Sequence, residues 1–220
     1  MRFDRITVVG AGAIGGWIGA HLARVGQPVS LLARGATLQA LRTQGLTLHE
    51  AGQTRSWPVQ ATDQAEALGV QDLVVISVKA PAMAEVAASV RPLIGPHTVV
   101  LTAMNGVPWW FLQGLGGAVD GQRLTSIDPD GAIDRALPLS GIVGGVVHAS
   151  CSVDAPGQVR HHFGQGLILG EPSGEASPRV QALCDLLVAA GFQASVSPRI
   201  QKDIWYKLWG NMTVNPVSAI

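Results

Sequence analysis

The sequence has little charge and very few lysines. Charged residues make up only 14% of its 220 residues, and 15 lysines and arginines balance 15 aspartates and glutamates. Just three of these cations are lysines, namely Lys79, Lys202 and Lys207. Without a basic excess, the electrostatic footprint of a nucleic-acid-binding protein is missing, so no nucleic-acid partner is expected. Hydrophobic residues make up 47% of the chain, which excludes a disordered protein and indicates a large buried core.

Cysteine is also scarce. The two cysteines, Cys151 and Cys184, are too few for a disulfide framework and lack the spacing of metal ligands. His161 and His162 are adjacent in an expected strand and therefore face opposite sides of it, which does not suit a single metal site. The sequence has no Gly-x-Ser-x-Gly nucleophile motif. We therefore expect neither a bound metal nor hydrolase chemistry.

Long apolar runs are missing as well. The longest stretch without a formal charge, residues 92–119, is interrupted by prolines, glycines and polar residues such as Asn105 and Gln113. A membrane-spanning helix needs about 20 predominantly apolar residues, so no membrane partner is expected. The first residues lead directly into a strand rather than into a signal peptide. Together with the scarce cysteines, this predicts a cytoplasmic protein.

The first half of the sequence alternates between strand and helix patterns. Short β-branched runs predict strands, and apolar residues at helical spacing predict helices between them. Such alternation predicts an α/β fold of the Rossmann type, a doubly wound and mostly parallel sheet with helices on both faces. The expected elements are strands at Ile6–Val9, Val29–Leu32, Leu73–Val78 and Thr98–Thr102, and helices at Ile14–Val25 and Pro81–Val90.

The pattern changes after Gly141. Alternating residues predict an antiparallel extension of the sheet, followed by a polar linker and two helices. The first of these helices has Ser177 as a candidate N-cap, and the second runs from Arg199 to Asn215–Pro216. We place a domain boundary between a Rossmann domain, 1–174, and the start of an all-helical domain, 175–220. The strands expected in the extension are Gly141–Val153, Gly157–Phe163 and Leu167–Leu169.

A glycine-rich turn joins the first strand to the first helix. Residues 10–15 read Gly-Ala-Gly-Ala-Ile-Gly, a G-x-G-x-x-G motif in the strand–helix–strand setting that gives it meaning. Gly10 makes the tight turn, Gly12 lets a pyrophosphate approach the backbone, and Gly15 lets helix and strand pack closely. The helix N-terminus, with Ala13 and Ile14, offers free N–H groups to phosphates. These five residues are candidate dinucleotide ligands.

The end of the second strand indicates which dinucleotide binds. NAD sites place an acidic residue there for the ribose 2′-hydroxyl, whereas NADP sites use a nearby arginine for the 2′-phosphate. This sequence reads Leu32-Ala33-Arg34-Gly35, and the next acidic residue is the distant Glu50. Arg34 therefore favours NADP(H) as the cofactor. The alternative is that Arg34 is a solvated loop residue.

Polar residues follow two further expected strands. Lys79 ends the run Asp72–Lys79, and Asn105 comes shortly after Thr102. Ligands of open α/β sheets bind just outside the carboxyl ends of the strands, so both residues are candidates for the site of the glycine loop. A solvated strand end for Lys79 and an Asn-Gly turn for Asn105 are the alternatives.

The last helix carries a polar stripe. Asp203, Lys207, Asn211 and Asn215 are spaced four apart, which places them along one side of the helix. The stripe is either a solvated face or the lining of a cleft. Asparagine is a poor helix former, and solvated faces prefer Glu, Lys and Arg, so the cleft is favoured. Amides can bind carboxylates, and an ammonium can protonate a developing alkoxide, which suits an anionic carbonyl substrate.

These motifs together resemble the ketopantoate reductase (2-dehydropantoate 2-reductase) family. They cover nearly the whole chain in the family's order, and the last group is the most specific. The matching landmarks are Gly10-Ala11-Gly12-Ala13-Ile14-Gly15, Ala33-Arg34-Gly35, Ser77-Val78-Lys79-Ala80, Asn105-Gly106-Val107, and Trp205-Tyr206-Lys207-Leu208-Trp209-Gly210-Asn211 with Asn215-Pro216.

The resemblance implies NADPH-dependent reduction of 2-dehydropantoate to pantoate, in pantothenate and coenzyme A biosynthesis. It implies Lys207 and Asn105 as catalytic residues, with Lys207 as the general acid that protonates the carbonyl oxygen. It also implies that Asn211 and Asn215 hold the substrate, and that Asn105 and Lys79 position substrate and nicotinamide. The family's helical domain continues past the Asn-Pro segment, so this chain is expected to carry a shortened one.

Two alternatives stay open. The same chemistry could act on another branched 2-oxo acid, because paralogous reductases share these motifs. The chain could instead be a non-catalytic NADP-binding module. A shortened helical domain would leave Ile204, Trp205 and Trp209 poorly covered, which favours aggregation or a homodimer.

Overall fold

The computed structural model describes residues 1–218, apart from the side chains of Asn215 and Ser218. Its strands are β1 (Ile6–Val9), β2 (Val29–Leu32), β3 (Leu46–Glu50), β4 (Gln53–Trp57), β5 (Gln60–Thr62), β6 (Leu73–Ile76), β7 (Val99–Thr102), β8 (Ile142–Ala155), β9 (Gln158–Gly170) and β10 (Gln193–Val196). Its α-helices are α1 (Ala13–Arg24), α2 (Gly35–Gln44), α3 (Met83–Val90), α4 (Ala132–Ala136), α5 (Pro178–Ala189) and α6 (Ile200–Ser218), with 3₁₀ turns at Ala65–Ala67, Ala80–Ala82, Arg91–Leu93, Gly117–Val119 and Leu139–Gly141.

The strands form one sheet in the order β4-β3-β9-β8-β7-β6-β1-β2-β5, with β10 added beside β9. Neighbouring strands from β5 through β2, β1, β6 and β7 to β8 pair in parallel, whereas β8 and β9 pair antiparallel. The expected Rossmann-type sheet with an antiparallel extension is therefore confirmed. The carboxyl ends of β1, β6 and β7 lie side by side at one edge of the sheet.

The extension differs from the sequence expectation in one respect. The predicted strands Gly157–Phe163 and Leu167–Leu169 are parts of a single strand, β9. The pairing with β8 shifts between His148 and Ser150, so β9 carries one extra residue there. Gly164, with φ +80°, lies in the shift, and its lack of a side chain permits this β-bulge. Glycine here bends the strand without ending it.

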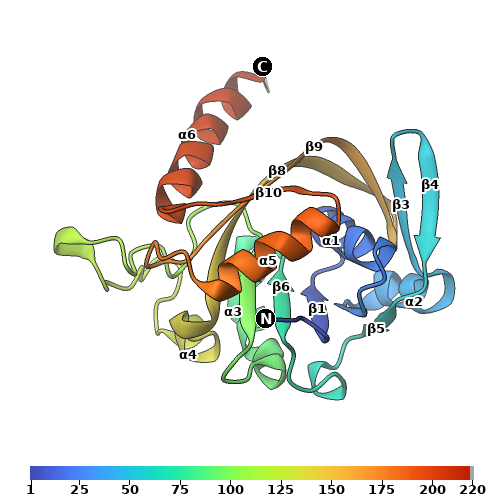
Figure 1. Cartoon of the computed structure of the whole chain (residues 1–220), viewed down its shortest axis with the longest axis horizontal. Coiled ribbons are helices and arrows are strands. Elements are labelled where there is room, and N and C mark those ends of the chain that lie inside the picture. The colour runs from blue at the N-terminus through green and yellow to red at the C-terminus, as the bar shows by residue number, and fades with distance from the viewer. Residues whose placement is uncertain (219–220) are drawn as a thin grey trace.

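The sheet curls around α1. In Figure 1 the long β8–β9 hairpin arches over α1 towards the β3–β4 hairpin, and β9 pairs in parallel with β3. Two glycines of α1 permit this close approach. A Cβ on Gly16 would lie 2.5 Å from Val159 of β9, and one on Gly19 would lie 3.2 Å from Leu31 of β2. Helix α1, which begins at the glycine loop, therefore packs closely against both β9 and β2.

Two apolar cores lie on opposite faces of the sheet. Because successive side chains of a strand point to opposite faces, Val8 and Val75 join the core around α1, while Val9 and Val74 join the core around α3. All four side chains are at most 2% exposed. Continuous apolar runs in β1 and β6 are thus explained by helices covering both faces.

The segment after residue 175 begins as part of the same sheet and core. Ser177 accepts a hydrogen bond from the N–H of Val180 and caps α5, as its sequence position predicts. Leu183 and Leu187 of α5 are fully buried in the core around α1. β10 then pairs in parallel with β9. The expectation that residues 175–220 are all-helical is therefore wrong. The boundary between residues 174 and 175 stays a prediction.

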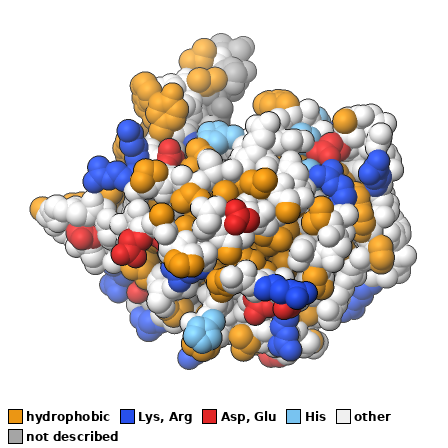
Figure 2. Space-filling view, in the orientation of Figure 1, with side chains coloured by type: hydrophobic (Ala, Val, Ile, Leu, Met, Phe, Trp, Pro, Cys, Tyr) orange, Lys and Arg blue, Asp and Glu red, His pale blue; other side chains and the backbone are white. Residues whose placement is uncertain are grey.

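Helix α6 leaves the body of the molecule. Ile200 and Ile204 at its start are buried, whereas Trp205, Trp209 and Met212 are 59%, 62% and 66% exposed. Figure 1 shows α6 rising away from the sheet, and Figure 2 shows hydrophobic side chains gathered on it. Trp205 and Trp209 are therefore poorly covered, as expected, whereas Ile204 is buried. Within the described residues, no helix is long and apolar enough to cross a membrane.

Candidate active site

The glycine loop between β1 and α1 is fixed by Ser77. Gly10 has φ +93°, which favours glycine, and its carbonyl oxygen accepts a hydrogen bond of 2.9 Å from the Ser77 hydroxyl. The same hydroxyl reaches the Val9 carbonyl oxygen at 3.2 Å. A Cβ on Gly15 would overlap both the Gly10 carbonyl oxygen and the Ser77 hydroxyl. The first and third glycines are therefore required by the close packing of loop, helix and β6.

The second glycine faces free space. Gly12 is the N-cap of α1, and a Cβ placed on it would meet no protein atom within 4 Å. Ala13, Ile14 and Gly15 follow in the first turn, where backbone N–H groups have no partner within the helix. A cavity of about 370 Å³ opens beside this turn and is lined by Gly10 and Gly12. A bare backbone, free N–H groups and open space fit a pyrophosphate.

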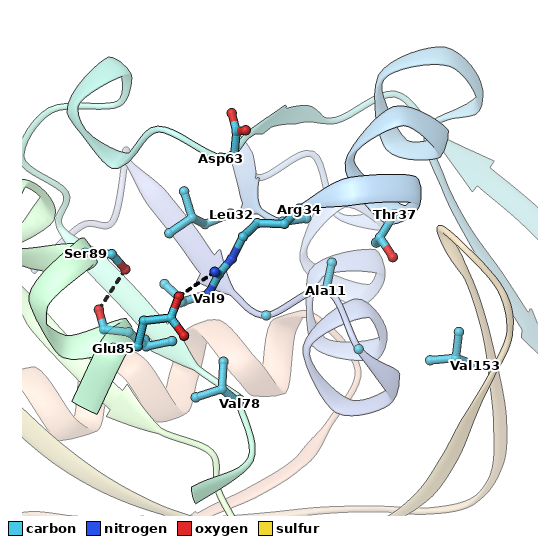
Figure 3. A pocket seen from close by; sticks show the side chains of 14 residues that line it. Val9, Ala11, Leu32, Arg34, Thr37, Asp63, Val78, Glu85, Ser89 and Val153 are labelled. Atoms are coloured by element: carbon cyan, nitrogen blue, oxygen red, sulfur yellow. Dashed lines mark hydrogen bonds and ion pairs between the residues drawn. The ribbon is translucent and has the colours of Figure 1, made fainter. Parts of the chain in front are cut away.

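Arg34 lies at the far end of the same cavity. It follows β2, forms the N-cap of α2, and lines the cavity with Thr37 and Asp63. Figure 3 shows its side chain extended towards α3, where its Nη1 lies 2.5 Å from the Glu85 Oε1. The structure therefore brings together the glycine loop and the arginine that the sequence assigned to one dinucleotide site. It adds an acidic residue on the opposite wall.

Lys207 belongs to α6, which packs against β8. Its Nζ donates to the Asn105 Oδ1 at 2.7 Å and to the Val147 carbonyl oxygen at 2.5 Å. β7 pairs with β8 only as far as Gly144, so the Val147 carbonyl lies beyond the end of β7. The lysine is thereby held by the loop after β7 and by the β8 backbone.

Burial changes the acidity of this lysine. Loss of solvent around Lys207 lowers its pKa below the ordinary lysine value, because burial disfavours the charged form. Among the described side chains and backbone groups it has these two acceptors, which use two of the three N–H groups of the ammonium. The nearby His148 has a pKa lowered by burial and by the Lys207 charge.

Asn211 lies beside Lys207. Both line a small cavity of about 10 Å³ together with Asn105 and Gly145, enough for about one water. Asp203, the first residue of the polar stripe, does not join them. It accepts a hydrogen bond from the Ser197 hydroxyl, which in turn accepts from the N–H of Arg199 at the start of α6. Asp203 therefore stabilises the helix start.

Lys79 lies outside the two cavities, and the side chain of Asn215 is not described. Lys79 is exposed at the N-cap of the Ala80–Ala82 turn, and within residues 1–218 it lines neither the cavity beside the glycine loop nor the small cavity beside Lys207. Its role in binding cofactor or substrate stays a prediction. Asn215 belongs to α6, but its side chain lies outside the described part of the chain. Its expected role in substrate binding is therefore also a prediction.

Comparison with known proteins identifies the family. A family model described as ketopantoate reductase PanE/ApbA matches residues 6–174. The chain belongs to the ketopantoate reductase family. A 2-dehydropantoate 2-reductase from Mesorhizobium japonicum is 47% identical over 217 residues, which cover 98% of this chain and 67% of that protein. The resemblance inferred from the motifs is confirmed.

Solved structures agree with this membership. A candidate ketopantoate reductase from Ralstonia solanacearum MolK2 superposes with a TM-score of 0.95 at 55% identity, covering 99% of this chain and 67% of that one. A ternary complex of D-mandelate dehydrogenase with NADH shows the same fold, with a TM-score of 0.78 at 23% identity over 96% and 62% of the two chains. The chain thus spans about two thirds of the length of its relatives.

Three parts of this reductase site escape the sequence motifs. Ser77 belongs to a motif that matches the family, but only the structure shows that its hydroxyl hydrogen-bonds to the glycine loop. Glu85 lies 51 positions after its partner Arg34, and no pattern links them. Val147 contributes a backbone carbonyl, so its side chain carries no signal.

Proposed function

We propose that this chain reduces 2-dehydropantoate to pantoate with NADPH as the hydride donor. The observation that carries the proposal is the hydrogen bond between Lys207 and Asn105, which holds a half-buried ammonium at the same end of the parallel strands as the glycine loop. Membership of the ketopantoate reductase family supplies the reaction class. The name of the relative from Mesorhizobium japonicum supplies the substrate.

The order of the strands supports one extended site. Arg34 follows β2, the glycine loop follows β1, and Asn105 follows β7, with β6 between the last two. Neighbouring strands are about 4.8 Å apart, so β2 and β7 are separated by about 14 Å. A dinucleotide held by Arg34 at one end and by the N-terminus of α1 in the middle would direct its nicotinamide towards Asn105 and Lys207.

The residues near Lys207 divide the chemistry among themselves. A bound nicotinamide dinucleotide supplies the hydride that reduces the carbonyl carbon. Lys207 donates a proton from Nζ to the carbonyl oxygen as negative charge develops there, and later regains a proton from solvent. Asn105 orients the ammonium through its Oδ1. The Asn211 amide is placed to donate to the substrate carboxylate, and we assign Asn215 the same role.

Arg34 supports NADPH as the preferred dinucleotide. Its guanidinium lines the cavity and can form paired hydrogen bonds with a 2′-phosphate. The end of β2 offers no acidic residue for a 2′-hydroxyl, since Arg34 is followed by Gly35 and Ala36. The strength of this preference depends on Glu85, because its carboxylate and a 2′-phosphate would bind the same guanidinium.

The test is a turnover assay combined with a binding assay. Tryptophan fluorescence titrated with NADPH should show saturable binding, and NADPH absorbance should fall when 2-dehydropantoate is added. A panel of other branched 2-oxo acids identifies the preferred substrate, and faster turnover on another acid would replace 2-dehydropantoate in the proposal. Binding without turnover on any 2-oxo acid would make the chain a non-catalytic NADP-binding module.

A further inference from the structure

The arginine at the adenosine end of the cavity already has a partner. Arg34 Nη1 and Glu85 Oε1 are 2.5 Å apart, and their side chains are 66% and 67% exposed. Figure 3 shows the two side chains reaching towards each other across the cavity, one from the end of β2 and one from α3. The guanidinium assigned to a 2′-phosphate is therefore neutralised by a carboxylate in the free protein.

The charge at this end of the cavity disfavours a phosphate. Among the described residues that line it, Arg34 is the only cation, whereas Asp63 and Glu85 are both acidic. A phosphate monoester carries a charge of about −1.5 to −2 at neutral pH. A phosphate that binds Arg34 through Nη1 must displace the Glu85 carboxylate from that nitrogen. The 2′-hydroxyl of NADH carries no charge and meets no such conflict.

The exchange is nevertheless feasible. Exposed ion pairs contribute little to stability, because water screens the charges and the two side chains lose freedom. An arginine–phosphate pair is stronger, because two parallel hydrogen bonds form at once. Glu85 is already two-thirds exposed, so its carboxylate can turn into solvent without leaving a buried charge. Glu85 therefore lowers the affinity for NADPH without preventing its binding.

We propose that Glu85 is a specificity-determining residue that competes with the 2′-phosphate of NADPH for Arg34. This inference rests on the proposed function, because it concerns the dinucleotide site of the same reductase. The competing carboxylate narrows the preference for NADPH over NADH that Arg34 alone would give. The ratio of the two affinities is then set by a pair of residues on different elements.

The test measures dissociation constants and needs no turnover. In Glu85→Gln the carboxylate is replaced by a neutral side chain of the same size. Titration of tryptophan fluorescence with each dinucleotide should show NADPH binding about threefold to tenfold tighter than in the unaltered chain. NADH binding should change by less than about twofold, because its 2′-hydroxyl does not compete for the guanidinium.

Two comparisons separate competition from general repulsion. Asp63→Asn removes a charge from the same cavity but leaves the Arg34–Glu85 pair intact, so it should tighten NADPH binding less than Glu85→Gln does. In a chain that already carries Arg34→Gln, adding Glu85→Gln should leave the NADPH dissociation constant unchanged, because nothing remains to be released. Two results would overturn the proposed competition. One is that Asp63→Asn tightens NADPH binding as much as Glu85→Gln does. The other is that Glu85→Gln tightens it fully in the chain that carries Arg34→Gln.

Failure of this inference is distinct from failure of the proposed function. If the unaltered chain binds NADPH and Glu85→Gln binds it equally well, only the role of Glu85 is overturned. Weaker NADH binding in Glu85→Gln would make Glu85 a hydrogen-bond partner of the ribose and would also overturn the competition. If the unaltered chain binds neither dinucleotide, the proposed function and the inference fall together.

Discussion

Lys207 is the residue on which the proposed chemistry depends. Its ammonium is half-buried and donates to Asn105 and Val147. Burial lowers its pKa, which makes the ammonium a better proton donor near neutral pH than a solvated lysine would be. Within the described part of the chain Lys207 forms no ion pair with a carboxylate, and the nearest acid of the stripe, Asp203, accepts a hydrogen bond from Ser197.

The rate of reduction should depend on pH through this lysine. Only the ammonium can donate a proton, so kcat should fall as the pH rises through the Lys207 pKa. Because burial lowers that pKa, the fall should be centred below the pH at which an ordinary lysine titrates. A profile of kcat against pH under saturating substrates measures the midpoint. A rate that stays constant up to the range of solvated lysines would contradict this assignment.

A sequence signal predicted some residues of the candidate site and misplaced others, since Lys79 had such a signal but lines neither cavity. The four-residue spacing of Lys207 and Asn211 predicted that they share a helix side, and both line one cavity with Asn105. The same spacing could not show that Asp203 accepts a hydrogen bond from Ser197 at the start of α6. Neither the backbone carbonyl of Val147 nor the pairing of Glu85 with Arg34 could be predicted, because both depend on long-range packing.

At the scale of elements, the turn from β1 into α1 defines the dinucleotide site. Its glycines serve different purposes. Gly15 avoids an overlap with Gly10 and Ser77, whereas Gly12 keeps the space beside the helix N-terminus open. Ser77 at the end of β6 links the loop to the neighbouring strand. Cofactor binding and folding can therefore be separated by substitutions at two positions only three residues apart.

Gly12→Ala and Gly15→Ala should fail in different ways. The Gly12 substitution should leave a folded protein, with a loss of less than about 1 kcal/mol from the helix cap. It should weaken NADPH binding by about tenfold or more, which corresponds to about 1.4 kcal/mol. Gly15→Ala should cost about 2–3 kcal/mol of stability through steric overlap. Urea unfolding and fluorescence titration measure the two effects, and equal stabilities would refute the distinction.

The elements that could be predicted are those with local signals. β1, α1 and β2 follow from the apolar runs and the glycine loop, and Ser177 and Pro178 indicate the start of α5. The helix α2 and strands β3, β4, β5 and β10 were not predicted. Their residues show little periodicity, and β4 is mostly exposed along its length. The four strands form because β3 and β10 pair with β9, β5 pairs with β2, and β4 pairs with β3, and no local pattern shows these pairings.

At the scale of the whole molecule, one sheet joins both ends of the chain. β10 pairs with β9, and α5 packs into the core around α1, so residues 178–196 support the dinucleotide site from the far side. Beyond them, α6 carries Lys207 at its inner face while its outer tryptophans are exposed. A homodimer through that outer face stays a prediction that sedimentation of the purified chain can test.

Removal of this segment should unfold the rest. Val180, Leu183, Leu187 and Phe192 are at most 4% exposed. Burial of each such side chain contributes about 1.5–3 kcal/mol, so the four together contribute about 6–12 kcal/mol. This is comparable to the whole free energy of unfolding of a typical domain, about 5–15 kcal/mol. A chain ending at residue 174 should therefore not unfold cooperatively, whereas one ending at residue 197 should. Thermal melts followed by circular dichroism decide, and a cooperative melt of the shorter chain would contradict the shared core.

The most direct test of the proposed function compares Lys207→Ala with Lys202→Ala. Lys202 lies on the same helix but is exposed and away from Asn105. Loss of the general acid should lower kcat on 2-dehydropantoate by about 10²–10⁴-fold and leave the NADPH dissociation constant nearly unchanged. Lys202→Ala should retain both values. Near-normal turnover of Lys207→Ala would contradict the account, because the proton would then come from another group.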